Sequence, residues 1–234
     1  MTQFLSLFDV NNTWFTTLGY QMSGVEFWGT IFNLWCVWLV AKNKILNWPV
    51  GIIGSVLFAV LFYQIHLYSD FLEQWYYVVT GFWGWWMWTK GSAKAVGDNE
   101  GVEKINKKEI GIWAMVIVIG TLMLTYGMKN LNVWFPMVFP VGASYAFLDA
   151  LTTVMSFVAQ WLLTKRKLEN WYLWICVDVI GVGLYFAKGV VFVSLLYFVF
   201  LILATKGLLT WKKIYKSRKK NAPRTDRREV LPTA

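Results

Sequence analysis

The sequence predicts an all-α integral membrane protein with seven transmembrane helices, arranged as two parallel three-helix repeats joined by a linker helix. Three observations support this fold class: apolar blocks recur along the chain, basic residues gather in alternate loops, and the two halves of the sequence resemble each other. Only 15% of the 234 residues are charged, whereas a soluble domain carries about a quarter. The composition therefore argues against an ordinary soluble protein.

The apolar blocks are each about 20 residues long, the length at which a helix crosses roughly 30 Å of hydrocarbon. We expect spans at residues 24–41, 48–65, 70–89, 110–128, 143–164, 170–187 and 189–210. Residues 3–18 are expected to form a short interfacial helix. The first residues lack a basic n-region and a small-residue cleavage site, so we expect no signal peptide. The predicted domains are an N-terminal segment at 1–23, a first repeat at 24–89, a loop and linker helix at 90–142, a second repeat at 143–210 and a basic tail at 211–234.

The basic residues are distributed very unequally between the two sides of the membrane. With seven spans, 20 of the 22 Lys and Arg residues fall on the side that holds the tail, and only Lys129 and Lys188 fall on the other. The positive-inside rule then places the N-terminus outside and the C-terminus in the cytoplasm. The net charge of +9 therefore reflects topology and lipid contact, and we expect no nucleic-acid partner.

The two halves of the chain match at a constant offset of 123 residues. Residues 47–88 and 170–211 both begin with Asn-Trp and end with Trp, and E-x3-T-x2-N at 26–33 matches D-x3-T-x2-S at 149–156. An even number of spans separates equivalent positions, so both copies have the same orientation. Parallel repeats of this kind occur in SWEET proteins and in major-facilitator transporters, which bind substrate near the midplane between the repeats.

Polar and aromatic side chains gather near the midplane of the predicted spans. Counted about half a span from each span boundary, at 1.5 Å per residue, the candidate binding residues lie at similar depth in the membrane. They are Asn33, Gln74, Tyr77, Thr153, Ser156, Trp174, Asp178 and Tyr197. Two pairs of repeat equivalents differ, because Ser55 matches Asp178 and Gln74 matches Tyr197. The predicted site is therefore asymmetric, as an asymmetric ligand requires.

Asp178 is the most informative of these residues, because a carboxylate at the bilayer centre costs about 3 kcal/mol to insert and marks a functional site by default. Two alternatives stay open: Asp178 ties its span to a neighbouring Tyr or Trp, and the Ser, Thr and Asn side chains bond to backbone. Further carboxylates lie near the outer ends, where a vestibule or gate is expected: Glu26, Asp70, Glu73 and Asp149. Most tryptophans are expected in interfacial belts, namely Trp28, Trp48, Trp83, Trp86, Trp134 and Trp211.

The chemistry of the expected pocket limits its ligand. No Lys or Arg lies at mid-depth, so nothing there recognises a phosphate or carboxylate. Aromatic faces and carboxylates favour a cation, or a flat ring with hydroxyl groups. We therefore expect a small, flat, unphosphorylated metabolite.

An enzyme is not expected from this sequence. His66 is the only histidine, Cys36 and Cys176 lie inside apolar blocks, and the chain has neither a P-loop nor a G-x-G-x-x-G motif. We expect no cofactor and no metal. A receptor that binds without translocating stays open as an alternative, although the sequence shows no sensory output domain.

Four motifs resemble the PnuC family of bacterial nicotinamide riboside transporters. They are W-P-V-G-I-I-G at 48–54, Y-x-D-x3-Q-x2-Y at 68–77, G-W-W-x-W at 84–88 and W-x2-W-x3-D at 171–178. The resemblance implies alternating-access, downhill transport of nicotinamide riboside (a vitamin B3 form used in NAD biosynthesis) across the inner membrane, with trapping by cytoplasmic phosphorylation. It also implies ligand contact for Trp174 and its neighbour Trp171, and less directly for Asp178.

The alternative within this resemblance is a related transporter for another vitamin, such as thiamine or riboflavin. Thiamine is also a flat cation, so composition does not separate the two. The lipid-facing surfaces suit a homo-oligomer, for which we expect a trimer.

Overall fold

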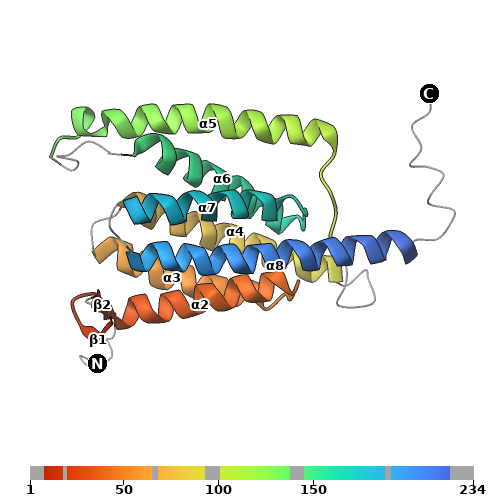
Figure 1. Cartoon of the computed structure of the whole chain (residues 1–234), viewed down its shortest axis with the longest axis horizontal. Coiled ribbons are helices and arrows are strands. Elements are labelled where there is room, and N and C mark those ends of the chain that lie inside the picture. Colours follow the sequence, from red (N-terminus) through yellow and green to blue (C-terminus); the bar gives the residue numbers. More distant parts are fainter. Residues whose placement is uncertain are drawn as a thin grey trace.

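The chain forms a bundle of helices with a short hairpin at one end (Figure 1). The computed structural model describes residues 8–17, 20–64, 68–92, 101–137, 145–187 and 191–221. Its helices are α2 (Gly24–Ala41), α3 (Asn47–Gln64), α4 (Tyr68–Ser92), α5 (Lys107–Trp134), α6 (Ala146–Thr164), α7 (Asn170–Ala187) and α8 (Val191–Asn221). Parts of the predicted segments fall outside the described residues: 1–7, 18–19, 65–67, 93–100, 138–144, 188–190 and the tail from 222.

Six of the seven described helices are long and apolar enough to cross a membrane, namely α2, α3, α5, α6, α7 and α8. The bounds of α2 and α7 coincide with the predicted spans, whereas α5 and α8 extend well beyond theirs. Helix α4 occupies the predicted span at 70–89, but polar residues such as Asp70, Glu73 and Gln74 leave it outside this apolar group. The protein is therefore a multi-pass helical membrane protein.

The N-terminal segment corrects the all-helical expectation. Strand β1 (Thr13–Thr17) pairs with β2 (Tyr20–Ser23) in an antiparallel hairpin, so residues 13–17 do not form the expected interfacial helix. The sequence TWFTT is rich in β-branched and aromatic residues, which favour strands. The Ser23 hydroxyl accepts a hydrogen bond from the Glu26 N–H at 3.4 Å and so caps the start of α2.

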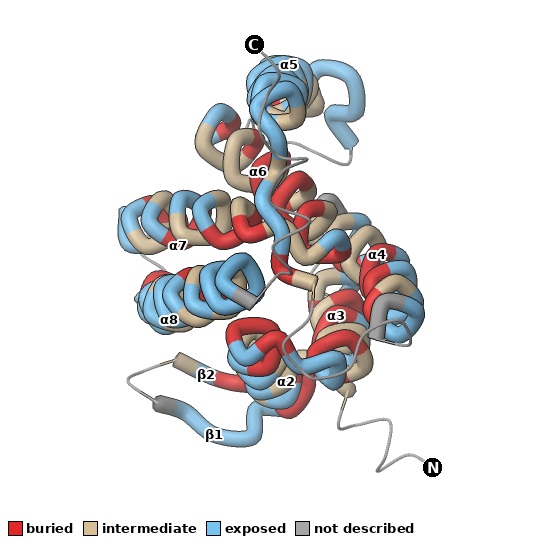
Figure 2. The backbone as a smooth tube through the Cα atoms, turned by 90° about the vertical axis from the view of Figure 1, so that its right-hand side faces the viewer, coloured by how far each residue is buried: buried red, intermediate tan, exposed pale blue. Residues whose placement is uncertain are grey.

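Six of the helices close into a ring, and α5 lies outside it. Helix α3 packs between α2 and α4, and α7 packs between α6 and α8. The ring closes where α4 packs on α6 and α2 packs on α8. Helix α5 packs on α6 and is largely exposed, as Figure 2 shows.

Local structure repeats at the offset found in the sequence. The α2–α3 and α6–α7 turns each place one residue in the left-handed region, Asn43 (φ 54°) and Arg166 (φ 49°). In each turn an asparagine amide, Asn47 or Asn170, donates to the carbonyl three residues earlier at 2.6 Å. Both pairs of positions are 123 residues apart, so these two turns repeat at the offset found in the sequence.

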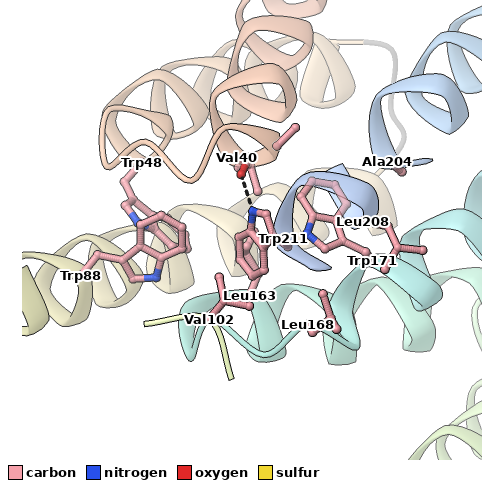
Figure 3. Close-up of a cluster of buried hydrophobic side chains, with 11 residues drawn as sticks. Val40, Trp48, Trp88, Val102, Leu163, Leu168, Trp171, Ala204, Leu208 and Trp211 are labelled. Carbon is pink, nitrogen blue, oxygen red and sulfur yellow. Dashed lines mark hydrogen bonds between the residues drawn. The ribbon is translucent and has the colours of Figure 1, made fainter. Parts of the chain in front are cut away.

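Four tryptophans, Trp48, Trp88, Trp171 and Trp211, form what we call the tryptophan cluster (Figure 3). Trp48 and Trp88 meet edge to face at 5.2 Å, and Trp171 and Trp211 do the same at 5.6 Å. All four are buried, so the expectation of an interfacial belt is wrong for Trp48 and Trp211. It fits the exposed Trp28, Trp83, Trp86 and Trp134.

The tryptophan cluster also links the two halves of the ring. The Trp88 indole of α4 donates to the Thr164 carbonyl of α6 at 3.1 Å. The Trp211 indole of α8 donates to the Val40 carbonyl of α2 at 3.0 Å, drawn as a dashed line in Figure 3. Each half therefore supplies one indole donor to the other half.

Gly207 is expected to be required for the packing of Trp171. A Cβ at Gly207 would lie 2.4 Å from the indole Cη2 of Trp171, so Gly207→Ala should cost about 1–3 kcal/mol through overpacking. The matched control is Gly183→Ala, where a Cβ meets nothing within 4 Å. Thermal unfolding in detergent should show a lower Tm for the first variant only; equal Tm values for both would contradict this packing.

Candidate functional site

Polar side chains from α4, α6, α7 and α8 meet between these helices. We define the polar cluster as the residues linked there by hydrogen bonds, ring stacking or electrostatic proximity: Asp70, Glu73, Tyr77, Asp149, Ser156, Asp178, Tyr185 and Tyr197. Seven of these, all but Tyr185, were predicted as binding or vestibule residues. The structure therefore brings together much of the site expected from sequence.

Helical periodicity explains why α4, α6 and α7 each contribute several members, while α8 contributes Tyr197. Asp70, Glu73 and Tyr77 stand at i, i+3 and i+7 on α4 and share one face. Asp149 and Ser156 have the same i, i+7 spacing on α6, as do Asp178 and Tyr185 on α7. The cluster is thus a set of polar stripes that face one another.

Hydrogen bonds and ring contacts connect these stripes. The Tyr77 hydroxyl donates to Oε1 of Glu73 at 2.5 Å and also interacts with the Ser156 side chain. The Tyr185 ring stacks on Tyr197 with centroids 5.2 Å apart and planes inclined by 17°. The cluster therefore combines ordered acidic groups with a stacked aromatic pair.

Gly181 allows Tyr197 to lie against α7 beside Asp178. A Cβ at Gly181 would lie 2.4 Å from Cδ1 of Tyr197, so a larger residue would displace the ring. Gly181 comes three residues after Asp178 and therefore lies on the same face of α7. The Ser194 hydroxyl, which donates to the Val182 carbonyl at 2.8 Å, holds α8 to α7 at this level.

Asp178 is 5% exposed. Across the described ranges, no hydrogen bond or ion pair reaches its carboxylate, so the alternative that Asp178 ties its span to a neighbouring Tyr or Trp is not formed there as a hydrogen bond. Tyr197 is close enough to interact with it electrostatically. A buried carboxylate without a partner needs a proton or a cation, so Asp178 is suited to meet a cationic ligand.

Two predicted binding residues lie in other surroundings. Trp171, 1% exposed, packs within the tryptophan cluster. The Asn33 amide donates to the Gly29 carbonyl of its own helix at 2.8 Å, which is the backbone alternative left open by the sequence. Neither residue belongs to the polar cluster as the structure defines it.

Three further predicted residues lie next to the polar cluster or between the two clusters. Trp174 is half-buried at the edge of the tryptophan cluster and precedes Asp178 by one turn. Gln74 is buried on α4 beside Glu73, and Thr153 is half-buried on α6 between Asp149 and Ser156. Their positions are compatible with ligand contact.

Glu26 belongs to the hairpin contact. It accepts a hydrogen bond from the Tyr20 hydroxyl, and the Tyr20 ring stacks on Phe192 of α8 at 4.9 Å. Burial, the hydrogen bond and the charge of Glu26 raise the pKa of Tyr20 well above its usual value. Glu26 therefore fastens the hairpin to α2, apart from Asp70 and Asp149.

The sequence analysis gave no role to Tyr185 and grouped Glu73 with the outer carboxylates. Their spacing from Asp178 and Tyr77, seven and four residues, was the available signal. The polar cluster holds four carboxylates and no basic residue. In the part of the chain that the structure describes, no three His, Cys, Asp or Glu side chains come close enough to hold a metal ion.

Apolar helices around a buried acidic and aromatic cluster define a multi-pass membrane protein of the transporter class. The family model described as "Nicotinamide mononucleotide transporter" matches residues 23–213, and the chain belongs to this family. The family consists of transporters, and the protein is not an enzyme.

Similar proteins agree with this membership. "Nicotinamide riboside transporter PnuC" of Escherichia coli (strain K12) is 30% identical over 214 residues, covering 82% of this chain and 87% of the relative. "Riboflavin/roseoflavin transporter RibM" of Streptomyces davaonensis is 25% identical, covering 78% and 82%. The solved "Crystal structure of the Vitamin B3 transporter PnuC" matches with a TM-score of 0.60 and 26% identity, covering 81% of this chain and 80% of that one.

Gly181→Ala tests whether the position of Tyr197 determines binding. The added methyl should push the ring away from Asp178 and weaken binding of nicotinamide riboside by about tenfold, or 1.4 kcal/mol. Gly183→Ala, on the same helix in open space, should bind within a factor of about two of the parent. Calorimetry on the purified variants measures both; unchanged affinity in Gly181→Ala would contradict a role for Tyr197.

Proposed function

We propose that the protein carries nicotinamide riboside across the bacterial inner membrane and binds it at the polar cluster. The observation that carries this proposal is Asp178, a buried carboxylate beside the stacked rings of Tyr185 and Tyr197. Nicotinamide riboside combines a pyridinium cation, a carboxamide and a ribose. An aromatic face contributes roughly 0.5–2 kcal/mol to binding a cation, and a carboxylate compensates its charge.

The other members of the site suit the remaining groups of this ligand. Tyr77, Tyr197 and Trp174 offer ring faces to the pyridinium. Gln74, Thr153 and Ser156 offer hydrogen bonds to the carboxamide and the ribose. Trp171 and Asn33 take part through the packing of α7 and α2, while Asp70 and Asp149 form a vestibule at the start of α4 and α6.

The absence of a basic residue in the polar cluster favours the riboside over its phosphorylated form. A phosphate would face the four carboxylates without an Arg or Lys to pair with it. Cytoplasmic phosphorylation would then trap the imported riboside, and transport would run downhill by facilitated diffusion. A transporter of riboflavin or thiamine is the alternative, since one relative is named for riboflavin.

The architecture behind this function is two parallel three-helix repeats, α2–α4 and α6–α8, with α5 as the linker helix in a 3-1-3, SWEET-like order. Helix bounds and turns that repeat at 123 residues support it. Ligand passage then occurs by alternating access, as the two repeats rock about the polar cluster.

The basic loops and tail support an outside N-terminus and a cytoplasmic C-terminus. A homo-oligomer, with a trimer as the expected form, stays a prediction.

Competition binding to the purified protein tests the substrate. Nicotinamide riboside should bind most tightly, and nicotinamide mononucleotide at least about tenfold more weakly because its phosphate meets the carboxylates. Nicotinamide, thiamine and riboflavin serve as further competitors. Binding of thiamine or riboflavin in place of the riboside would show that the protein is a transporter of that vitamin instead.

Asp178→Asn tests the charge of the site separately from its shape. Loss of the carboxylate should weaken nicotinamide riboside binding by about ten- to a hundredfold, because the pyridinium loses its counter-charge. The reduced riboside, whose dihydropyridine ring carries no charge, should bind the variant and the parent alike. A similar loss for both ligands would show that Asp178 acts through structure and not through charge.

A further inference from the structure

Residues 101–106, which lead into α5, lie across the tryptophan-lined end of the bundle; we call them the linker strap. Val102 is 0% exposed although it lies in an irregular segment, while its neighbours Glu103 and Lys104 are exposed. Its side chain belongs to the same buried cluster as the four tryptophans (Figure 3). Val102 therefore seals this end of the core from outside the helices.

Backbone hydrogen bonds fasten the linker strap to the α6–α7 turn. The Glu103 N–H donates to the Arg166 carbonyl at 3.1 Å, and the Leu168 N–H donates to the Glu103 carbonyl at 2.8 Å. The Ile105 N–H donates to Oε2 of Glu169 at 3.0 Å. The strap is thus held as a single short β-bridge at the surface.

Ionic contacts add to this attachment without making it strong. Glu103 Oε2 lies 2.9 Å from Nζ of Lys167, and its Oε1 lies 3.9 Å from a guanidinium nitrogen of Arg218. The Glu103 side chain is 52% exposed, and exposed ion pairs of this kind contribute about 0–1 kcal/mol each. The ionic contacts therefore contribute little, and the strap is held mainly by its hydrogen bonds and by the burial of Val102.

The linker strap also lies where the two halves of the ring meet. The Arg166 guanidinium carbon lies 4.2 Å from the ring centroid of Trp88 on α4. Gly101, with a φ of 98°, lies directly against the Arg166 side chain, since a Cβ there would be 2.7 Å from its terminal nitrogen. Strap, turn and α4 therefore form one contact zone at the end opposite to Asp70.

We propose that the linker strap is a gate: Val102 closes the tryptophan-lined end while the polar cluster receives ligand, and Val102 withdraws for the ligand to leave. This inference rests on the proposed transport function. Asp70 and Trp88 lie 18 residues apart on α4, which separates the two ends by about 27 Å. A ligand bound at the polar cluster would have to pass the strap to complete its crossing.

Side-specific labelling tests the seal without any ligand. In protein with Cys36→Ala and Cys176→Ala, a Ser156→Cys reporter is reconstituted and exposed to a membrane-impermeant maleimide on the side of the α8 C-terminus. Val102→Asp should raise the labelling rate by about tenfold, because burying a carboxylate among the tryptophans is unfavourable and the strap would leave its closed position more often. Lys107→Asp, an exposed change next to the strap, is the control. Equal slow labelling in all three proteins would overturn the proposal.

A reversible staple tests the same gate in transport and covers the case in which Val102→Asp does not fold. Glu103→Cys with Lys167→Cys joins bridge partners, whose strands lie about 4.8 Å apart, within reach of a disulfide. Oxidation should slow nicotinamide riboside exchange by about tenfold, and dithiothreitol should restore it, with each single cysteine as control.

The result that would overturn the gate is exchange at the same rate in the oxidised and the reduced protein. Failure of the unstapled protein to bind or exchange the riboside would instead contradict the proposed function. The labelling experiment separates the two, because it reports on the seal in the absence of a substrate.

Discussion

Two indole N–H groups hold the ring of helices closed. The last-turn carbonyls of a helix have no partner within that helix, and an unsatisfied carbonyl in a low-dielectric interior is costly. Trp88 satisfies the carbonyl of Thr164, and Trp211 bonds that of Val40, which also accepts the Asn43 N–H at 2.8 Å, each across the boundary between the halves. Glycine at 84 and 207 lets the facing tryptophans pack tightly enough for both bonds to form. The contacts of α2 with α8 and of α4 with α6 depend on this exchange.

The tryptophan cluster packs the helices together at one end of the ring. Toward the other end, the same helices carry the acidic and tyrosine residues that form the polar cluster. Equivalent positions have diverged there: Ser55 corresponds to Asp178, and Gln74 corresponds to Tyr197. The tryptophan cluster kept its symmetry, since it serves packing in both halves. Symmetry is therefore retained where the four tryptophans pack the core and lost in the polar cluster.

Sequence predicted the helices well, because span length and loop charge can be read directly from the chain, and the offset of 123 residues recurs in the turns at Asn43 and Arg166. The hairpin was missed although its residues favour strands locally; its contact with the helices, the stacking of Tyr20 on Phe192, joins residues far apart in the sequence. Trp171, Trp174 and Asp178 share a face as predicted, but seven residues of helix cover about 10 Å. One end of that face therefore lies in the tryptophan cluster and the other in the polar cluster. Depth along a helix was readable from sequence, whereas the neighbour on the next helix was not.

Helix α8 has 31 residues and is therefore about 46 Å long, which exceeds the hydrocarbon thickness by roughly 16 Å. Figure 1 shows its C-terminal part continuing past the other helices. This part carries Lys212, Lys213, Lys216, Arg218, Lys219 and Lys220. Basic groups gain about 1 kcal/mol each beside anionic headgroups. Helix α8 would therefore act as a depth anchor that fixes how far the ring sinks into the bilayer.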